Sequence, residues 1–322
     1  MMKYLMYTVM MMGTMMVTSS NNWITMWMGL EINMMSFVPM MKSKSMESSK
    51  SMMMYFLMQS LGSMMMMISL LINSSILLTP DSMETMVNSL IIISMMIKMG
   101  LPPMQTWMIK TMQSMNWTPC LILMSWQKIA PLTIINQTIN NQLTTIIIVT
   151  ASFTGAMGGI NQTCLRTIMA YSSISHMSWM MLLTCNSKLW ITYMMIYLIM
   201  MTTICKMMKS ENIFYLNQFN SLNHNNKMTF TLNMMSMGGM PPMIGFIPKW
   251  ITIQSAVTTN NIPIITMMSI LSLITLMYYM NMISPYLMKS SLTTKMQMKK
   301  SHKTSTTMLV MMLPTLMMLS LT

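Results

Sequence analysis

Charged residues are scarce in this chain. They make up 7% of its 322 residues, and aspartate and glutamate together number five. A soluble domain carries about a quarter charged residues, so a water-soluble globule is excluded. The phosphate-binding sequences Gly-x-Gly-x-x-Gly and Gly-x-x-x-x-Gly-Lys-Ser/Thr are absent, and we therefore expect no nucleotide site.

Cysteine is also rare, and the four residues give no sign of metal or redox chemistry. None of them has Cys-x-x-Cys spacing, and each lies in or beside an apolar segment. We interpret them as small core hydrophobes and expect neither a disulfide nor a metal site. They are Cys120, Cys164, Cys185 and Cys205.

Long apolar runs, by contrast, recur from end to end. Hydrophobic residues make up 53% of the chain, and 63 of its residues are methionine. Runs of about 17 to 25 apolar residues are typical of membrane-spanning helices. We expect an all-α polytopic membrane protein, forming a single integral membrane domain over residues 1–322. About eleven spans are predicted, near 4–19, 22–41, 52–73, 84–110, 118–137, 142–162, 168–185, 189–207, 228–256, 262–284 and 306–321.

The net charge of +13 fits this membrane topology. Such an excess could indicate nucleic-acid binding. However, the loop cations fall on one side of the predicted topology, with Lys188 as the exception. The positive-inside rule explains that asymmetry, so we expect a lipid bilayer and no nucleic acid as a partner.

Four ionisable residues stand inside the predicted spans or at their breaks: Glu31, Lys98, Lys128 and Lys249. A charge at the bilayer centre costs about 2.5–3.5 kcal/mol on insertion scales, so such residues usually pair or line a polar path. Two other interpretations stay open. A Glu–Lys pair can simply clamp helices together, and a lysine near a span end, Lys249 above all, can extend to the interface.

Two of the spans are too long for one straight helix, and each contains Gly-x-Pro-Pro. The residues are Gly100, Pro102 and Pro103 in one span and Gly239, Pro241 and Pro242 in the other. Proline removes a main-chain donor and breaks the helix, and paired interrupted helices are typical of inverted-repeat transporters. We predict an antiporter-like inverted repeat, with halves near 1–137 and 142–284 and an extra C-terminal helix over 306–321. Two ordinary proline kinks are the alternative.

His176 stands in the apolar stretch Ala170–Met177 (AYSSISHM). A histidine near the membrane centre can relay protons, because its charge changes near neutral pH. It can equally be a hydrogen-bonded packing residue, and the sequence leaves both open.

Five stretches together resemble the mitochondrial NADH dehydrogenase subunit 2 family: Gly29–Asn33 (GLEIN), Trp126–Pro131 (WQKIAP), Asn161–Arg166, Ala170–Met177 and Gly245–Trp250 (GFIPKW). They occur in order across nearly the whole chain, which makes the set more specific than any single motif. The methionine-rich composition also resembles arthropod mitochondrial proteins.

The resemblance implies a core membrane-arm subunit of respiratory complex I, a proton-translocating NADH:ubiquinone oxidoreductase, in the mitochondrial inner membrane. It implies that Glu31 and Lys98 interact as acid and base, that Lys128 is a central relay, and that Lys249 is the terminal group of the second half. Flavin, iron–sulfur clusters and ubiquinone would belong to other subunits, so this chain would carry no cofactor. Its partners would be other membrane-arm and accessory subunits and lipid, with cardiolipin as one candidate.

Two positions depart from the family pattern. Gln105 stands where the family usually has histidine, and Thr167 where a lysine is usual. Two rival functions also stay open. One is a stand-alone sodium/proton antiporter of the same ancestry, and the other is a structural membrane subunit whose buried charges only lock helices together.

Overall fold

The computed structural model describes residues 2–43, 46–75, 82–138, 141–186, 189–221, 224–259 and 261–292. The chain divides into two compact units, Met1–Ala151 and Ser152–Thr322. The described residues form helices and contain no β-strand, only an isolated bridge between Cys164 and Tyr215. The helix expected over 306–321 lies outside the described residues.

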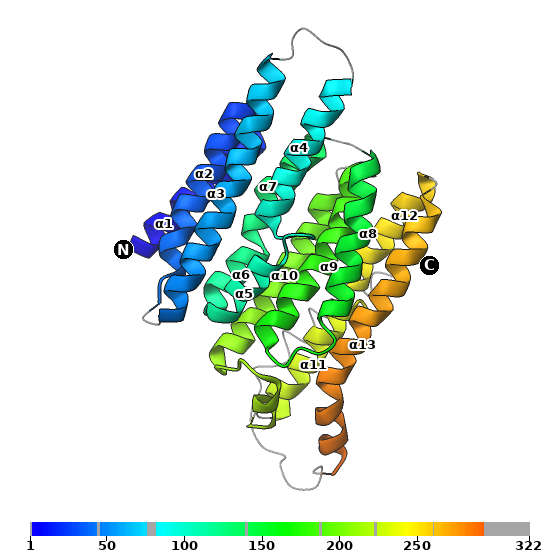
Figure 1. Cartoon of the computed structure of the whole chain (residues 1–322). Coiled ribbons are helices and arrows are strands. Elements are labelled where there is room, and N and C mark those ends of the chain that lie inside the picture. The colour runs from blue at the N-terminus through cyan, green and yellow to red at the C-terminus, as the bar shows by residue number, and fades with distance from the viewer. Residues whose placement is uncertain are drawn as a thin grey trace. The chain divides into compact units, whose positions relative to one another are not determined.

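In the first unit, helices that follow one another in the sequence, from α1 to α4, also pack against each other (Figure 1). Its helices are α1 (Met2–Ser19), α2 (Trp23–Met41), α3 (Met46–Ser75), α4 (Ser82–Met99), α5 (Thr106–Ser114), α6 (Trp117–Met124), the 3₁₀ helix η1 (Trp126–Lys128), α7 (Ile129–Gln137) and most of α8 (Asn141–Gly158). Helix α1 packs on α2, α3 packs on α4 and α5, and α7 contacts both α1 and α4.

The second unit places α9 at its centre. Its remaining elements are α9 (Leu165–Asn186), α10 (Trp190–Ser210), η2 (Leu216–Ser221), α11 (His224–Gly238), α12 (Phe246–Thr258) and α13 (Ile262–Leu292). Helices α10, α12 and α13 all pack against α9, and α11 packs against α10 and α13. Methionines from several of these helices are completely buried, because the unbranched thioether adapts to irregular gaps.

Each predicted span within the described residues coincides with one helix or with one interrupted helix. Four of the helical segments are long and apolar enough to cross a membrane by length and composition: Met46–Asn73, Trp117–Gln137, Trp190–Ser210 and Ile262–Pro285. The count of eleven spans therefore stays a prediction.

The span predicted over 118–137 contains a break that we did not expect. Helix α6 ends at Met124, and the chain passes through η1 before α7 begins at Ile129. Pro131 provides the physical reason, because its ring has no N–H for the carbonyl of Gln127 four residues earlier and clashes with that carbonyl. The sequence signal for this break was present, and the interruption places Lys128 directly beside it.

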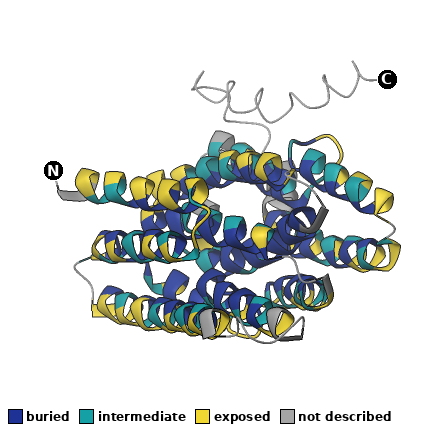
Figure 2. Ribbon diagram, turned by 90° about the horizontal axis from the view of Figure 1, so that it is seen from above, coloured by how far each residue is buried: buried dark blue, intermediate teal, exposed yellow. Residues whose placement is uncertain are grey.

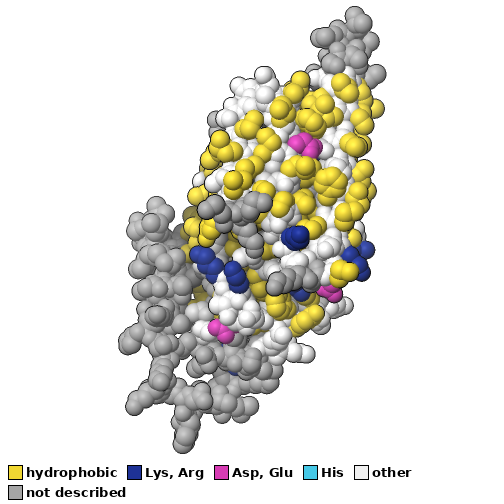
Figure 3. All heavy atoms as spheres, turned by 90° about the vertical axis from the view of Figure 1, so that its left-hand side faces the viewer, with side chains coloured by type: hydrophobic (Ala, Val, Ile, Leu, Met, Phe, Trp, Pro, Cys, Tyr) yellow, Lys and Arg dark blue, Asp and Glu magenta, His cyan; other side chains and the backbone are white. Residues whose placement is uncertain are grey.

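Most helices bury one face and expose the other, whereas the central helix α9 has no exposed residue between Leu165 and Thr184. Figure 2 shows exposed and buried positions segregated on many of the helices. Figure 3 shows hydrophobic side chains covering the upper part of the face drawn there, with the basic side chains gathered around and below its middle. An apolar surface of this extent is typical of contact with membrane or with other proteins.

Candidate functional site: buried charges at helix interruptions

The first interrupted helix closes with a left-handed glycine. Gly100 has a φ of +68°, which a residue without a Cβ adopts at little cost. Its N–H donates to the carbonyl of Ile97 at 3.2 Å, and the N–H of Leu101 donates to that of Met96 at 3.1 Å. This pair of bonds is the Schellman arrangement that ends a helix.

The second interrupted helix ends in the same way. Gly239 has a φ of +76°. Its N–H donates to the carbonyl of Ser236 at 3.0 Å, and the N–H of Met240 donates to that of Met235 at 3.3 Å. The two Gly-x-Pro-Pro sequences therefore produce one local backbone geometry, once in each unit.

Side chains also donate to main-chain carbonyls at the interruptions. At the first break, the indole N–H of Trp107 donates to the carbonyl of Ile97 at 3.1 Å. The amide of Gln59, on α3, donates to that of Lys98 at 2.9 Å. At the second break, the carbonyl of Gly238 accepts a bond of 2.8 Å from Lys249. Protein donors thus take the place of the lost helical ones, as non-helical backbone inside a membrane requires.

Lys98 lies in the last turn of α4 and is only 7% exposed. Its side chain runs over Gly62 of α3, where an added Cβ would lie 2.8 Å from the lysine Cγ. Glu31, on α2, is half-buried and acts on Lys98 electrostatically. Within the described residues the two groups form no direct ion pair, so they interact through space.

Lys128 is the most deeply buried of the three lysines, with 2% of its surface exposed. The amide of its neighbour Gln127 donates to the side-chain oxygen of Asn33 on α2 at 2.9 Å and lies 3.4 Å from the sulfur of Met10 on α1. The hydroxyl of Tyr55, on α3, donates to the oxygen of that amide at 3.4 Å. The segment that carries Lys128 is thereby attached to three helices of the first unit.

Lys249 lies in the first turn of α12 and is 7% exposed. Its ammonium group donates to the carbonyl of Gly238, at the end of α11. The left-handed Gly239 makes this approach possible, because a Cβ there would lie 2.8 Å from the lysine Nζ. The side chain of Lys249 therefore turns into the second break.

His176 lies on α9 with 4% of its surface exposed. Its Nδ1 is hydrogen-bonded to the hydroxyl of Tyr193 at 2.8 Å, and its ring centroid lies 5.1 Å from that of Tyr197. The geometry is that of a hydrogen-bonded, buried histidine. The relay role stays a prediction.

Both departures from the family pattern are visible in the structure. The side-chain oxygen of Gln105, just before α5, is buried and has no hydrogen-bond partner among the described residues. The hydroxyl of Thr167 donates to the carbonyl of Cys164 at 2.7 Å, inside the first turn of α9. Neither side chain can take up a proton, so neither supplies the protonatable group that the family usually has at that position.

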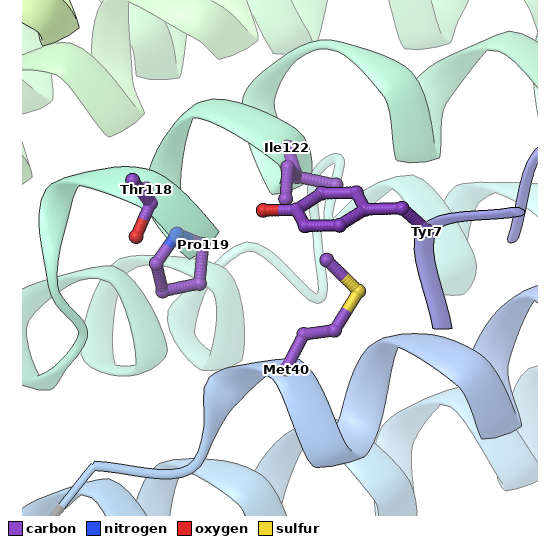
Figure 4. A pocket seen from close by; sticks show the side chains of 5 residues that line it. All are labelled: Tyr7, Met40, Thr118, Pro119 and Ile122. Atoms are coloured by element: carbon purple, nitrogen blue, oxygen red, sulfur yellow. The ribbon is translucent and has the colours of Figure 1, made fainter. Parts of the chain in front are cut away.

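A small pocket lies elsewhere in the first unit, between α1, α2 and α6 (Figure 4). Tyr7, Met40, Thr118, Pro119 and Ile122 line it, with the tyrosine hydroxyl directed toward α6. Its volume is about 40 Å³, whereas pockets for small molecules measure about 300 Å³ or more. The pocket has room for water only, and none of the interior charges lines it.

The structure thus brings Glu31 and Lys98 within electrostatic reach and places Lys128 beside a third interruption in the same unit. Gly62, Gln59 and Tyr55 were missed at the sequence level, because they act only through tertiary contacts. Gly62 offered a weak signal, since an isolated glycine inside a helical pattern often marks a close approach.

A family model described as NADH:quinone oxidoreductase/Mrp antiporter, transmembrane, matches residues 20–275. NADH-ubiquinone oxidoreductase chain 2 of Anopheles gambiae is 37% identical over 277 residues, which cover 84% of this chain and 81% of that protein. The same protein of Locusta migratoria is 38% identical over 285 residues, covering 87% and 83%.

Solved structures share the fold at low sequence identity. A chain of respiratory complex I from Thermus thermophilus matches with a TM-score of 0.81 and 16% identity, over 88% of this chain and 70% of that one. A chain of the Mrp complex from Dietzia sp. matches with a TM-score of 0.77 and 15% identity, over 86% and 59%.

Proposed function

Because the chain belongs to the NADH-ubiquinone oxidoreductase chain 2 family, we propose that it is a core membrane-arm subunit of complex I whose interior lysines carry part of the proton path. The observation that supports this most is the position of those lysines. Lys98 lies in the last turn of α4, the ammonium group of Lys249 donates to the carbonyl at the end of α11, and Lys128 lies at a third interruption.

A helix interruption is a suitable place for a group that gains and loses a proton. Helix C-terminal carbonyls carry a partial negative charge, which favours an ammonium group. An apolar interior favours the neutral amine instead. When the two influences oppose each other, a modest change in the surroundings decides which form is present.

We propose the following roles. Glu31 and Lys98 form the acid and base of a first half-path, Lys128 continues it, and Lys249 ends the second half. His176, bonded to a tyrosine hydroxyl, is the candidate proton relay of the second half, which ends at Lys249.

The finer features of the expected architecture belong to the same proposal. The chain would cross the mitochondrial inner membrane about eleven times as an inverted repeat, in contact with other complex I subunits and with lipid such as cardiolipin. Redox cofactors would reside in those other subunits. The repeated Schellman geometry at the two Gly-x-Pro-Pro breaks supports the repeat.

The stand-alone antiporter is the weaker candidate. The Mrp complex supports it through shared fold alone, whereas relatives named NADH-ubiquinone oxidoreductase chain 2 match most of the chain at 37% and 38% identity. Purification separates the two, because an antiporter would be isolated without NADH-oxidising partners.

Replacement of Lys98 tests the proposed path. We expect Lys98→Met to assemble into the complex and to lower coupled NADH:ubiquinone turnover severely, because methionine fills the space without binding a proton. Lys110→Met is the matched control, since Lys110 is exposed on α5. Normal turnover with normal proton pumping in Lys98→Met would refute the proposed path.

A further inference from the structure

The side-chain amide of Gln127 contacts three partners in the interior of the first unit. Its nitrogen contacts the oxygen of Asn33 at 2.9 Å and the sulfur of Met10 at 3.4 Å. Its oxygen accepts the hydroxyl of Tyr55 at 3.4 Å. A primary amide offers two donors and one acceptor oxygen, so one group joins α1, α2 and α3 at a single point.

The backbone around Gln127 needs such an attachment. It lies in η1, where Pro131 removes the helical donor for its carbonyl, and Ser125 before it departs from helical geometry with a ψ of −77°. A three-residue 3₁₀ segment has few bonds of its own. The position of η1 is therefore set largely by side-chain contacts.

A continuous set of contacts runs from this amide to the first break. Tyr55, which is 1% exposed, packs edge-on against Trp107 with ring centroids 6.0 Å apart. The indole N–H of Trp107 in turn holds the carbonyl of Ile97, one residue before Lys98. Gln127, which precedes Lys128, is thus connected through Tyr55 and Trp107 to Ile97, which precedes Lys98.

We propose that Gln127 is a positioning residue that holds the segment carrying Lys128 in a fixed place relative to α2 and to the break at Lys98. This inference rests on the proposed proton path. A primary amide neither gains nor loses a proton in the physiological range, so Gln127 acts by geometry and is not itself a carrier.

A length swap across the 2.9 Å hydrogen bond tests this role. Gln127→Asn withdraws the amide by one methylene and breaks the bond to Asn33. Asn33→Gln extends the opposite partner by the same length, so the double variant can form the bond again. In the intact complex we expect Gln127→Asn to lower coupled turnover about five-fold, the factor that corresponds to loss of one neutral hydrogen bond, and the double variant to recover most of it.

Gln113→Asn is the matched control, because Gln113 is exposed on α5 of the same unit, and it should leave turnover unchanged. Wild-type turnover in Gln127→Asn would overturn the inference, as would a double variant no better than the single one. If Gln127→Asn prevents assembly, recovery of assembly by the swap supports the inference and failure to recover overturns it.

Lys128→Met, measured in parallel, distinguishes this inference from the proposed path. Normal pumping in Lys128→Met would mean that the path itself is wrong. Loss of pumping in Lys128→Met together with normal turnover in Gln127→Asn would mean that the path stands and that Gln127 does not position it.

Discussion

Substitution of Gly62 by alanine should move Lys98 without removing its charge. Gly62 lies within α3, where alanine would ordinarily stabilise the helix by about 1 kcal/mol. Here the added Cβ would lie 2.8 Å from Cγ of Lys98 and 3.2 Å from the main-chain oxygen of Ser94. Ordinary contact begins at 3.4 Å, so the lysine must shift by about 0.6 Å, and the nearby backbone oxygen limits how α3 can adjust.

The expected effect of Gly62→Ala is on rate more than on stability. The helix preference of alanine and the displacement of Lys98 act in opposite directions on folding, so assembly should change little. A misplacement of about 1 Å can lower a reaction rate about a hundred-fold, and we expect a shift of about half that size to cost about ten-fold in coupled NADH:ubiquinone turnover.

Turnover per assembled complex, measured in membrane vesicles, gives the comparison. Ser60→Ala on the same helix serves as the control, because the hydroxyl of Ser60 is exposed and bonds the carbonyl of Leu57 in its own helix. Equal turnover in Gly62→Ala and wild type would refute the argument that the position of Lys98 matters.

Two further predictions concern single contacts. Glu31→Gln and Lys98→Met should be less damaging together than the sum of the singles, because a buried charge without its partner is strongly destabilising. Strict additivity of coupled turnover in that double-mutant cycle would count against the interaction. Tyr193→Phe should lower the thermal inactivation midpoint of the complex, since it removes the hydroxyl bonded to His176, at a cost of about 1–3 kcal/mol. Tyr197→Phe should lower it less, because the hydroxyl of Tyr197 makes no contact as close as the 2.8 Å bond between Tyr193 and His176, and equal effects of the two would contradict this reasoning.

Local chemistry explains why much of the fold could be predicted from the sequence. Apolar runs of membrane-spanning length located the described helices, and Gly-x-Pro-Pro located the two breaks, because both depend on neighbouring residues alone. Lys98, Lys128 and Lys249 stood out for a similar reason, since a lysine inside an apolar run is conspicuous.

Tertiary contacts could not be predicted in the same way. The bond from Lys249 to the carbonyl of Gly238 depends on how the chain folds back after the second break. The meeting of Gln127 with Asn33 joins segments far apart in the sequence. The interruption at η1 is an intermediate case. Pro131 predicts that the helix is disturbed near this point, but the sequence does not show that the disturbance takes the form of a 3₁₀ helix.

The ratio of protons moved to electrons transferred tests the central claim most directly. It should be measured in sealed vesicles that contain the intact complex, with wild type compared with Lys128→Met after a pulse of NADH. If the interior lysines carry protons, the variant complex should assemble and show either a lower ratio or severely reduced turnover. An unchanged ratio at wild-type turnover in Lys128→Met would contradict the account.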